Sequence, residues 1–334
     1  MKKHANLSIF VPHAGCPQQC SFCNQHSISG AMNLPTAKDV AAMCEAHLPV
    51  PGEGANTEIA FFGGSFTAID RTLMEQMLAA AAPFVEAGRA AGIRISTRPD
   101  AIDPAVLMVL KRYHVTAIEL GAQSMSDTVL RLNRRGHNAL SVRFAAAQIK
   151  NAGFSLGLQM MVGLFGETDP VRFARDTAIA LAGLAPDTVR IYPALVLKDT
   201  YLATLMEGGA YKPLTVEQAV EATAPLIALF EEKGIKVIRV GLHDEPCLAE
   251  SVVGGPYHPA FRQLCEARLY LEEFRRQLLS AKPGEYTAIV AVGQRSTAAG
   301  QKNENLTRLA QAGYQLVITE SPTVTGRTVM IQTK

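Results

Sequence analysis

Three cysteines lie close together near the start of this 334-residue sequence. Cys16, Cys20 and Cys23 follow the spacing C-x3-C-x2-C, and Phe22 stands directly before the last of them. Three thiolates can bind three iron corners of a [4Fe-4S] cubane and leave the fourth iron open to another ligand. The spacing therefore favours an iron-sulfur cluster at these three residues.

The same cysteines allow a second metal. Cys and His are the usual structural ligands of zinc, so a zinc site completed by His13 or His26 is the alternative. Six cysteines in a chain of this length do not indicate a disulfide scaffold, and the close spacing of three of them indicates metal binding in a reducing compartment. Cys44, Cys247 and Cys265 are scattered, and we expect them to be small core residues.

The cysteines directly follow the first of several short apolar runs that alternate with longer helical patterns. The expected strands are 7–13, 57–63, 93–98, 115–120, 154–161, 187–193 and 236–242. The expected helices are 36–47, 71–86, one opened by Asp103-Pro104, two after Ser126 and Ala139, one opened by Asp169-Pro170, and one with a Thr215–Gln218 capping box. This β/α rhythm predicts a mostly parallel sheet with right-handed crossovers. Periodicity by itself does not separate a partial barrel from an open sheet.

The rhythm stops after residue 242, where Gly254, Gly255, Pro256 and Pro259 mark the best candidate for a domain boundary. We expect two domains, residues 1–250 and residues 251–334. The second is expected to contain a helix over 260–279, a strand over 286–292, a helical stretch over 303–312, and strands near 314–319 and 327–332.

The composition is typical of a packed globular protein, and its basic and acidic residues nearly balance. Hydrophobic residues make up 48% and charged residues 19%, and 32 basic against 30 acidic residues give a formal charge of +2. A nucleic-acid partner would therefore have to be held by a local basic patch. The first apolar stretch is broken by Pro12 and His13 and is too short for a signal peptide or a membrane span, so we expect a cytoplasmic protein with no membrane partner.

The cysteine loop and the segment Phe61–Thr67, which follows the second strand, resemble the radical S-adenosylmethionine (SAM) superfamily. In that superfamily a glycine-rich motif at this place contacts the methionine amino group of SAM, which implies such contacts from Gly63, Gly64 and Ser65. Glycines let a backbone approach a ligand closely. Ser65 stands where many members have Glu. The resemblance implies an α/β fold, namely a partial (β/α)6 radical SAM barrel with a small C-terminal α/β appendage.

Further stretches resemble the radical SAM part of the Elongator catalytic subunit and its bacterial and archaeal relatives. They are STRPD (96–100), ELGAQS (119–124), LRLNRRGHN (130–138), GLQMMVGLFGET (157–168), RIYPALVLKDT (190–200), YKPLT (211–215) and GGPYHPAF (254–261). The resemblance implies that Gln123, Gln159 and either Arg135 or Arg134 line the SAM and substrate side of the barrel. Barrel sites lie at the carboxyl ends of the strands, where these residues are expected.

Other polar residues in these stretches have structural explanations. We expect Arg98 and Asp100 to form an ion pair within a loop. His137 and Tyr192 could serve proton transfer or stacking, but as single residues they are expected to be core residues with satisfied hydrogen bonds. His258 is expected in a structural turn. No residue is assigned to the chemistry of the substrate.

The resemblance implies an enzyme in which a [4Fe-4S] cluster, reduced by a flavodoxin- or ferredoxin-type donor, cleaves SAM to methionine and a 5'-deoxyadenosyl radical. That radical would abstract hydrogen from a substrate, and tRNA or another RNA nucleoside is expected. Two alternatives stay open. One is a radical SAM oxidase or dehydrogenase of a small metabolite or tetrapyrrole, and the other is a non-catalytic iron-sulfur or zinc protein that binds RNA.

The C-terminal part raises two further expectations. The Elongator subunit carries an acetyltransferase domain after its radical SAM part, and the remainder of this sequence is too short for one, so we expect no acetyl transfer. The order of strand, loop, helix and strand around Gly300 is similar to a KH module, whose GxxG loop clamps an RNA backbone, although Asn303 replaces the second glycine. Arg295, Lys302 and Arg308 would be its basic contacts. The alternative is a small capping domain with a charged, solvated face.

Overall fold

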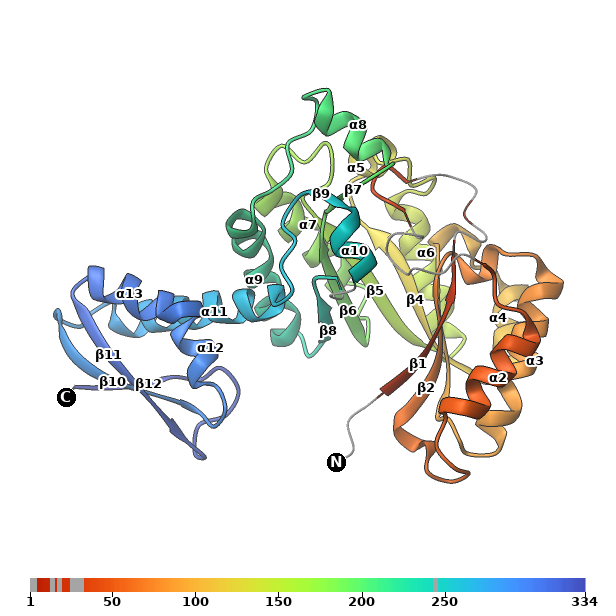
Figure 1. Ribbon diagram of the computed structural model, residues 1–334, viewed down its shortest axis with the longest axis horizontal. Coiled ribbons are helices and arrows are strands. Elements are labelled where there is room, and N and C mark those ends of the chain that lie inside the picture. The colour runs from red at the N-terminus through yellow and green to blue at the C-terminus, as the bar shows by residue number, and fades with distance from the viewer. Residues whose placement is uncertain (1–4, 13–15, 17–19, 25–32, 243–245, 334) are drawn as a thin grey trace.

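The computed structural model describes residues 5–12, 16, 20–24, 33–242 and 246–333. Its main feature is a seven-stranded parallel sheet that curls into a half-barrel (Figure 1). The strands are β1 (Ala5–Val11), β2 (Thr57–Gly63), β3 (Gly92–Thr97), β4 (Val115–Gln123), β5 (Ser155–Val162), β6 (Thr188–Pro193) and β8 (Lys236–Val240). They pair in chain order, with β1 and β8 at the two edges, so the barrel is open between these strands. The predicted partial barrel is confirmed.

Helices join these strands and cover the outer face of the sheet (Figure 1). They are α2 (Ala37–His47), α3 (Arg71–Glu86), α4 (Pro104–Arg112), α5 (Asp127–Leu132), α6 (Ala139–Asn151), α7 (Pro170–Ala182), α8 (Tyr201–Glu207) and α9 (Val216–Glu232), with short 3-10 turns η1 (Gly54–Asn56), η2 (Phe66–Ala68) and η3 (Pro99–Ala101). Helix starts follow from capping. Asp103 and Asp169 cap α4 and α7, and the Thr215–Gln218 capping box of α9 is present as predicted.

Side chains along the barrel strands alternate between the helix-covered core and the barrel interior. In β2, Ile59 and Phe61 are fully buried in the core beneath the helices, whereas Phe62 faces a cavity inside the barrel. The same alternation places Ile93 and Ile95 of β3 in the core and leaves Arg94 facing inward. The outer core therefore holds the sheet together, and the inward positions are free to carry polar residues.

A short antiparallel pair lies beside the barrel opening. Strand β7 (Val196–Leu197) pairs with β9 (Val252–Gly254), which follows α10 (Pro246–Ser251). Leu195, Leu197 and Leu248 form a small apolar cluster there. Neither strand, nor α8 and α10, was predicted. Strands of two and three residues are too short to show an alternating pattern, and helices of six and seven residues span fewer than two turns of the helical period.

The chain then continues into a smaller lobe through α11 (Phe261–Leu278) (Figure 1). Its elements are β10 (Gly284–Ala291), α12 (Arg295–Ala299), η4 (Gln301–Asn303), α13 (Glu304–Gln311), β11 (Tyr314–Ser321) and β12 (Met330–Thr333). Strand β10 is central in a three-stranded sheet, parallel to β11 and antiparallel to β12. Helix α12 and the 3-10 turn η4 were not predicted, and the other elements were.

Helix α11 belongs to two cores. Phe261 and Cys265 pack into the barrel core, whereas Tyr270 and Phe274 pack into the core of the smaller lobe. The change of core thus falls within α11, and the proposed division at residue 250 stays a prediction.

Ion pairs connect the smaller lobe to the barrel. Arg308 of α13 pairs with Glu217 of α9 at 3.2 Å. Arg327 pairs with Glu231 of α9 and with Glu266 of α11. Exposed ion pairs contribute about 0–1 kcal/mol each, so these contacts orient the lobe more than they stabilise it.

Within the described ranges, every helix is too short or too polar to cross a membrane.

The two-core role of α11 generates a stability prediction. Phe274→Ala should lower the free energy of unfolding of the smaller lobe by about 3–5 kcal/mol, because a fully buried aromatic side chain leaves a cavity. Leu279→Ala is the matched control, since that side chain is 84% exposed. Urea unfolding followed by circular dichroism measures both changes, and equal effects of the two substitutions would contradict the assignment of Phe274 to a core.

Candidate cluster and SAM site

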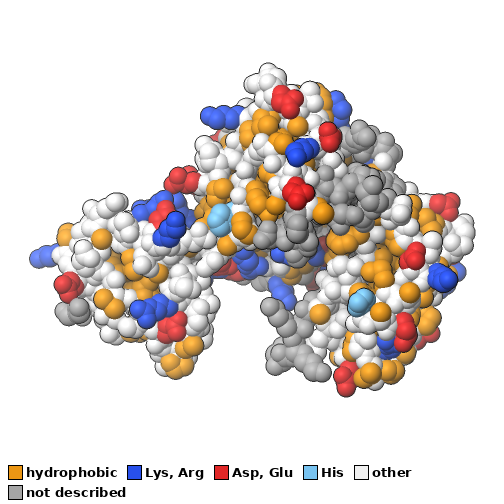
Figure 2. Space-filling view, viewed as in Figure 1, with side chains coloured by type: hydrophobic (Ala, Val, Ile, Leu, Met, Phe, Trp, Pro, Cys, Tyr) orange, Lys and Arg blue, Asp and Glu red, His pale blue; other side chains and the backbone are white. Residues whose placement is uncertain are grey.

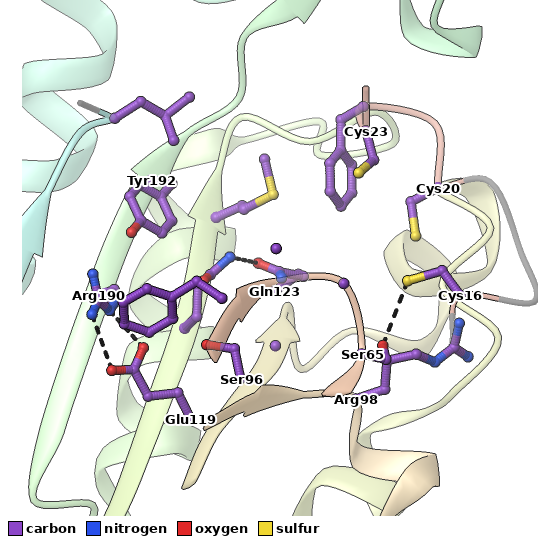
Figure 3. A pocket seen from close by; sticks show the side chains of 18 of the residues that line it. Cys16, Cys20, Cys23, Ser65, Ser96, Arg98, Glu119, Gln123, Arg190 and Tyr192 are labelled. Atoms are coloured by element: carbon purple, nitrogen blue, oxygen red, sulfur yellow. Dashed lines mark hydrogen bonds and ion pairs between the residues drawn. The ribbon is translucent and has the colours of Figure 1, made fainter. Parts of the chain in front are cut away.

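A cavity of about 1310 Å³ occupies the inside of the half-barrel. Its wall includes every residue that the sequence nominated for cofactor binding, namely Cys16, Cys20, Cys23, Gly63, Gly64, Ser65, Gln123, Arg134, Arg135 and Gln159. Figure 3 shows the three cysteines on one side of this cavity, with Arg190 and Tyr192 on the other. The structure therefore brings together residues that lie far apart in the chain.

The cysteine sulfurs lie at the carboxyl end of β1 beside polar groups. Cys16 Sγ lies 3.5 Å from Ser65 Oγ, and Arg135 Nη1 donates to Cys20 Sγ at 3.0 Å. Burial raises the pKa of the Cys23 thiol to about 12, and the neighbouring Cys20 and Cys16 add to this rise. Three ionised thiolates at this place therefore need a positively charged partner, which a metal cluster supplies.

The described part of the chain contains no group of three His, Cys, Asp or Glu side chains placed around a single metal ion. A cubane binds each thiolate at a different iron, so its ligands need not converge on one point. His13 and His26, the expected further ligands of a zinc site, lie outside the described residues.

The turn after β2 lies against the end of β1. Gly63 has φ +106°, a conformation that favours glycine, and a Cβ there would lie 3.1 Å from the Val11 carbonyl oxygen. The Gly64 amide donates to the same oxygen at 2.7 Å. Ser65 follows and is buried. The close approach of the two backbones explains why glycine is needed at residue 63 and why Ser65 reaches the cysteine loop.

Two glutamines meet between β4 and β5, Gln123 at the end of β4 and Gln159 within β5. Gln159 Nε2 donates to Gln123 Oε1 at 3.3 Å. Strand β4 ends at Gln123, three residues beyond its predicted end, after an irregularity in register between Gly121 and Gln123. Gln123 has φ +65° and Arg134 has φ +54°. Such backbone strain in non-glycine residues is concentrated at functional sites.

Arg98 and Arg135 form a braced pair beneath the cysteines. Arg98 donates from Nε and Nη2 to Asp100 at 2.9 and 2.7 Å, which confirms the predicted ion pair. Arg98 Nη2 also donates to the Arg135 carbonyl oxygen at 3.1 Å. Their side chains are buried, and Arg98 Nη1 and Arg135 Nε have no hydrogen-bond partner in the described structure. Buried donors of this kind are normally satisfied, so these two fit an anionic ligand such as the carboxylate of SAM or a cluster.

A ladder of ion pairs crosses the barrel interior, and the sequence analysis missed it. Arg94 bonds Glu58 at 2.8 Å and Glu119 at 3.2 Å, and Arg190 bonds the same Glu119 at 2.6 Å. Phe62 lies over Arg190, with the guanidinium carbon 5.1 Å from the ring centroid. Charged residues at alternate positions of otherwise apolar strands were the available signal, because alternation places them together inside the barrel.

The remaining candidates divide between site and core. Tyr192 packs against a small apolar cluster, as expected of a core residue, and it also lines the cavity. Burial raises its pKa, and the nearby charge of Arg190 opposes this rise. His137 is buried as predicted, and burial lowers its pKa to about 4. Its hydrogen bonds are not all satisfied as expected, because Nε2 bonds the Ala122 carbonyl oxygen at 3.3 Å whereas Nδ1 has no partner among the described residues. His258 Nδ1 accepts from the Ala260 amide at 3.1 Å, which confirms its structural turn.

Comparison with known proteins identifies the family. The model of the radical SAM superfamily matches residues 10–174, and the model of the radical SAM C-terminal domain matches residues 186–273. The chain belongs to the radical SAM superfamily. Members of this superfamily use a [4Fe-4S] cluster and SAM, which removes the alternative of a non-catalytic zinc or iron-sulfur protein. When bound, these cofactors supply a 5'-deoxyadenosyl radical by reductive cleavage of SAM.

Relatives within the superfamily are Elongator-type proteins. The chain is 31% identical over 136 residues to the "tRNA uridine(34) acetyltransferase" of Methanocaldococcus infernus, covering 40% of this chain and 25% of that protein. It is 33% identical over 183 residues to human "Elongator complex protein 3", covering 53% and 32%. A solved structure of M. infernus Elp3, lacking its N-terminus, aligns with a TM-score of 0.64 and 20% identity over 82% of this chain and 64% of that one, which shows a shared fold. The sequence matches thus span about a quarter to a third of these relatives.

The cysteine loop generates a cofactor prediction. The anaerobically reconstituted radical SAM protein should hold about four irons per chain, and Cys16→Ala, Cys20→Ala or Cys23→Ala should each lose them, since three thiolates hold a cubane. Iron and sulfide analysis with visible absorbance measures this. Cys44 and Cys265 are buried as expected, but Cys247 is exposed, so the expectation of a core residue is wrong for it. Cys247→Ala is the control, because its side chain does not line the cavity. Full iron content in the three variants would contradict the assignment.

The ion-pair ladder generates a stability prediction. Glu119→Gln should lower the free energy of unfolding by about 3–5 kcal/mol, because it leaves two buried guanidinium groups without their shared carboxylate. Glu75→Gln should change it by about 0–1 kcal/mol, because Glu75 pairs with Arg71 at the surface. Denaturant unfolding compares the two, and similar small effects would show that Glu119 does not hold the ladder.

Proposed function

We propose that this radical SAM enzyme acts on an RNA nucleoside, with tRNA as the first candidate substrate. The proposal assigns the cluster to the three cysteines of the loop and SAM to six further residues of the cavity wall. These are Cys16, Cys20 and Cys23 for the cluster and Gly63, Gly64, Ser65, Gln123, Arg135 and Gln159 for SAM. A ferredoxin- or flavodoxin-type protein is the proposed electron donor.

The observation that carries the substrate proposal is the charge of the cavity wall. Seven basic side chains line it, against two carboxylates, Glu119 and Asp199. The basic residues are Arg94, Arg98, Arg134, Arg135, Arg190, Lys236 and Arg239. Glu58 and Asp100 pair with two of these arginines from outside the wall. Counting them as well, the cavity has seven cations and four carboxylates. Such a cavity attracts polyanions, and nucleic acids are the commonest of these.

The outer surface lacks a comparable concentration of charge on the face that Figure 2 shows. There, the coloured acidic and basic side chains are interspersed over both lobes. This agrees with the small net charge of the sequence. The local basic patch that RNA binding requires is therefore proposed to be the cavity itself.

The part of the cavity across from the cysteines suits a planar ring. Phe62 and Arg190 stack there, and Tyr192 and Ser96 line the same region (Figure 3). Proteins bind unpaired RNA bases by stacking them on aromatic rings or guanidinium planes and by bonding their polar edges. Enzymes that modify a base inside a folded RNA first take it out of its stack. A flipped nucleobase between this surface and SAM would lie within reach of the radical.

The relatives agree with this substrate class. The M. infernus protein carries the name of a tRNA uridine(34) acetyltransferase. The segment shared with it covers part of that protein, so its acetyl transfer is not proposed for this chain. The shared segment supports the RNA substrate of the radical SAM part.

The expected RNA contact of the smaller lobe stays a prediction. The loop over Gly300–Asn303 lies between α12 and α13, and Gly300, Lys302 and Asn303 all have positive φ. Arg308 pairs with Glu304 at 2.6 Å as well as with Glu217. A phosphate contact by Arg308 would have to replace both ion pairs, so Lys302 is the better candidate.

The stacking surface generates the functional test. Formation of 5'-deoxyadenosine by the reduced, SAM-loaded enzyme should rise when bulk tRNA is added. Phe62→Ala should lower kcat/KM for tRNA about 10-fold or more, because base stacking on an aromatic ring contributes about 1–3 kcal/mol. Phe144→Ala, on the outer face of α6, is the matched control and should leave it unchanged. A rise with a small anionic metabolite and none with tRNA would overturn the RNA proposal.

A further inference from the structure

We infer that Arg135 sets the reduction potential of the iron-sulfur cluster. Its guanidinium donates to the sulfur of Cys20, and its positive charge favours the reduced cluster, which carries one more negative charge. The inference rests on the assignment of the cluster to the cysteine loop and is independent of the RNA substrate.

The guanidinium is held in place by two hydrogen bonds. Nη1 donates to Cys20 Sγ at 3.0 Å, and Nη2 donates to the Gly121 carbonyl oxygen at 2.7 Å. The Phe22 ring, from the cysteine loop itself, lies with its centroid 5.9 Å from the guanidinium carbon. Because Arg135 is 7% exposed, solvent screens its charge weakly.

Arg98 holds the backbone of Arg135 in place. It donates to the Arg135 carbonyl oxygen, and Asp100 holds it with two hydrogen bonds. Asp100 also compensates the charge of Arg98. Arg135, in contrast, forms no ion pair with a carboxylate of the described residues, so its charge is directed at the thiolates. Arg98 is thus a positioning residue, and Arg135 is the residue that contacts the cluster ligand.

The sign of the effect follows from electrostatics. An external one-electron donor is oxidised as the cluster is reduced, and the added negative charge stays within the cluster and its thiolates. A buried cation stabilises the more negative state more strongly, and hydrogen bonds to cluster sulfurs act in the same direction. Arg135 therefore raises the potential and makes reduction by a given donor easier. Ser65, near Cys16, is neutral and cannot supply this charge.

Arg134 provides a matched control in the neighbouring position. It lines the same cavity, but its guanidinium carbon lies 3.5 Å from the centroid of the Tyr201 ring and not on a cysteine sulfur. Arg134→Gln removes the same charge as Arg135→Gln without removing a hydrogen bond to the cluster ligands.

The experiment is a redox titration of the reconstituted full-length protein without SAM and without RNA. The electron paramagnetic resonance signal of the reduced cluster measures the reduced fraction. Arg135→Gln should lower the equilibrium constant for reduction about 10-fold, which is about 59 mV for one electron. Arg135→Lys, which keeps the charge, should recover most of this change. Arg134→Gln should shift the constant by less than 3-fold, in keeping with the missing sulfur contact.

Two results would overturn the inference. One is a potential of Arg135→Gln equal to that of Arg134→Gln, and the other is a shift that occurs only after SAM is added, which would make Arg135 a SAM ligand alone. Should Arg135→Gln fail to retain iron, Arg98→Gln takes its place, because it removes the brace and leaves the Asp100 charge uncompensated. An iron-loaded Arg98→Gln protein with the wild-type potential would equally refute the inference. If the variants show the expected potentials but tRNA does not stimulate the wild-type enzyme, the RNA proposal is contradicted and the inference on Arg135 stands.

Discussion

The pairing of charges inside the half-barrel is the constraint on which the rest of the structure depends. Strand alternation sends Glu58, Arg94, Glu119 and Arg190 inward, where an unpaired charge would cost several kcal/mol. Glu119 serves two arginines, so neighbouring strands must keep a register that brings all four together. The outer core supplies the stability that allows this interior to remain polar and hollow.

The polar interior also determines the charge and the ligands of the site. Two strands that carry the ladder, β2 and β4, end at the glycine turn and at Gln123. The cysteine loop follows β1 and Gln159 lies in β5, so one sheet positions both the floor and the rim of the cavity. The carboxylates of the ladder pair with its own arginines, so basic side chains outnumber acidic ones on the cavity wall. Such a wall suits anions, which agrees with the proposed cluster at the cysteines and the proposed RNA substrate.

Two residues with positive φ and two buried donors without a partner in the described structure lie at the same rim. Gln123 and Arg134 have positive φ, and Arg98 and Arg135 each keep a buried donor without a partner. Each of these costs stability in the protein alone. Bound cofactors would satisfy the donors, so folding of the rim and loading of the cofactors are expected to be coupled.

The sequence by itself determined most of the helices and strands and predicted the cysteine loop as the cluster site, whereas β7, β9, α8, α10 and α12 were not predicted. Caps such as Asp103 and Thr215 act within one turn of helix, the strands are marked by apolar runs, and the spacing of Cys16, Cys20 and Cys23 is a local pattern. Only the tertiary structure decided which distant side chains meet. The Glu119 ladder, the contact of Arg135 with Cys20 and the inward position of Tyr192 depend on strand register and on the curl of the sheet, which arise from packing over the whole barrel and leave no local signature.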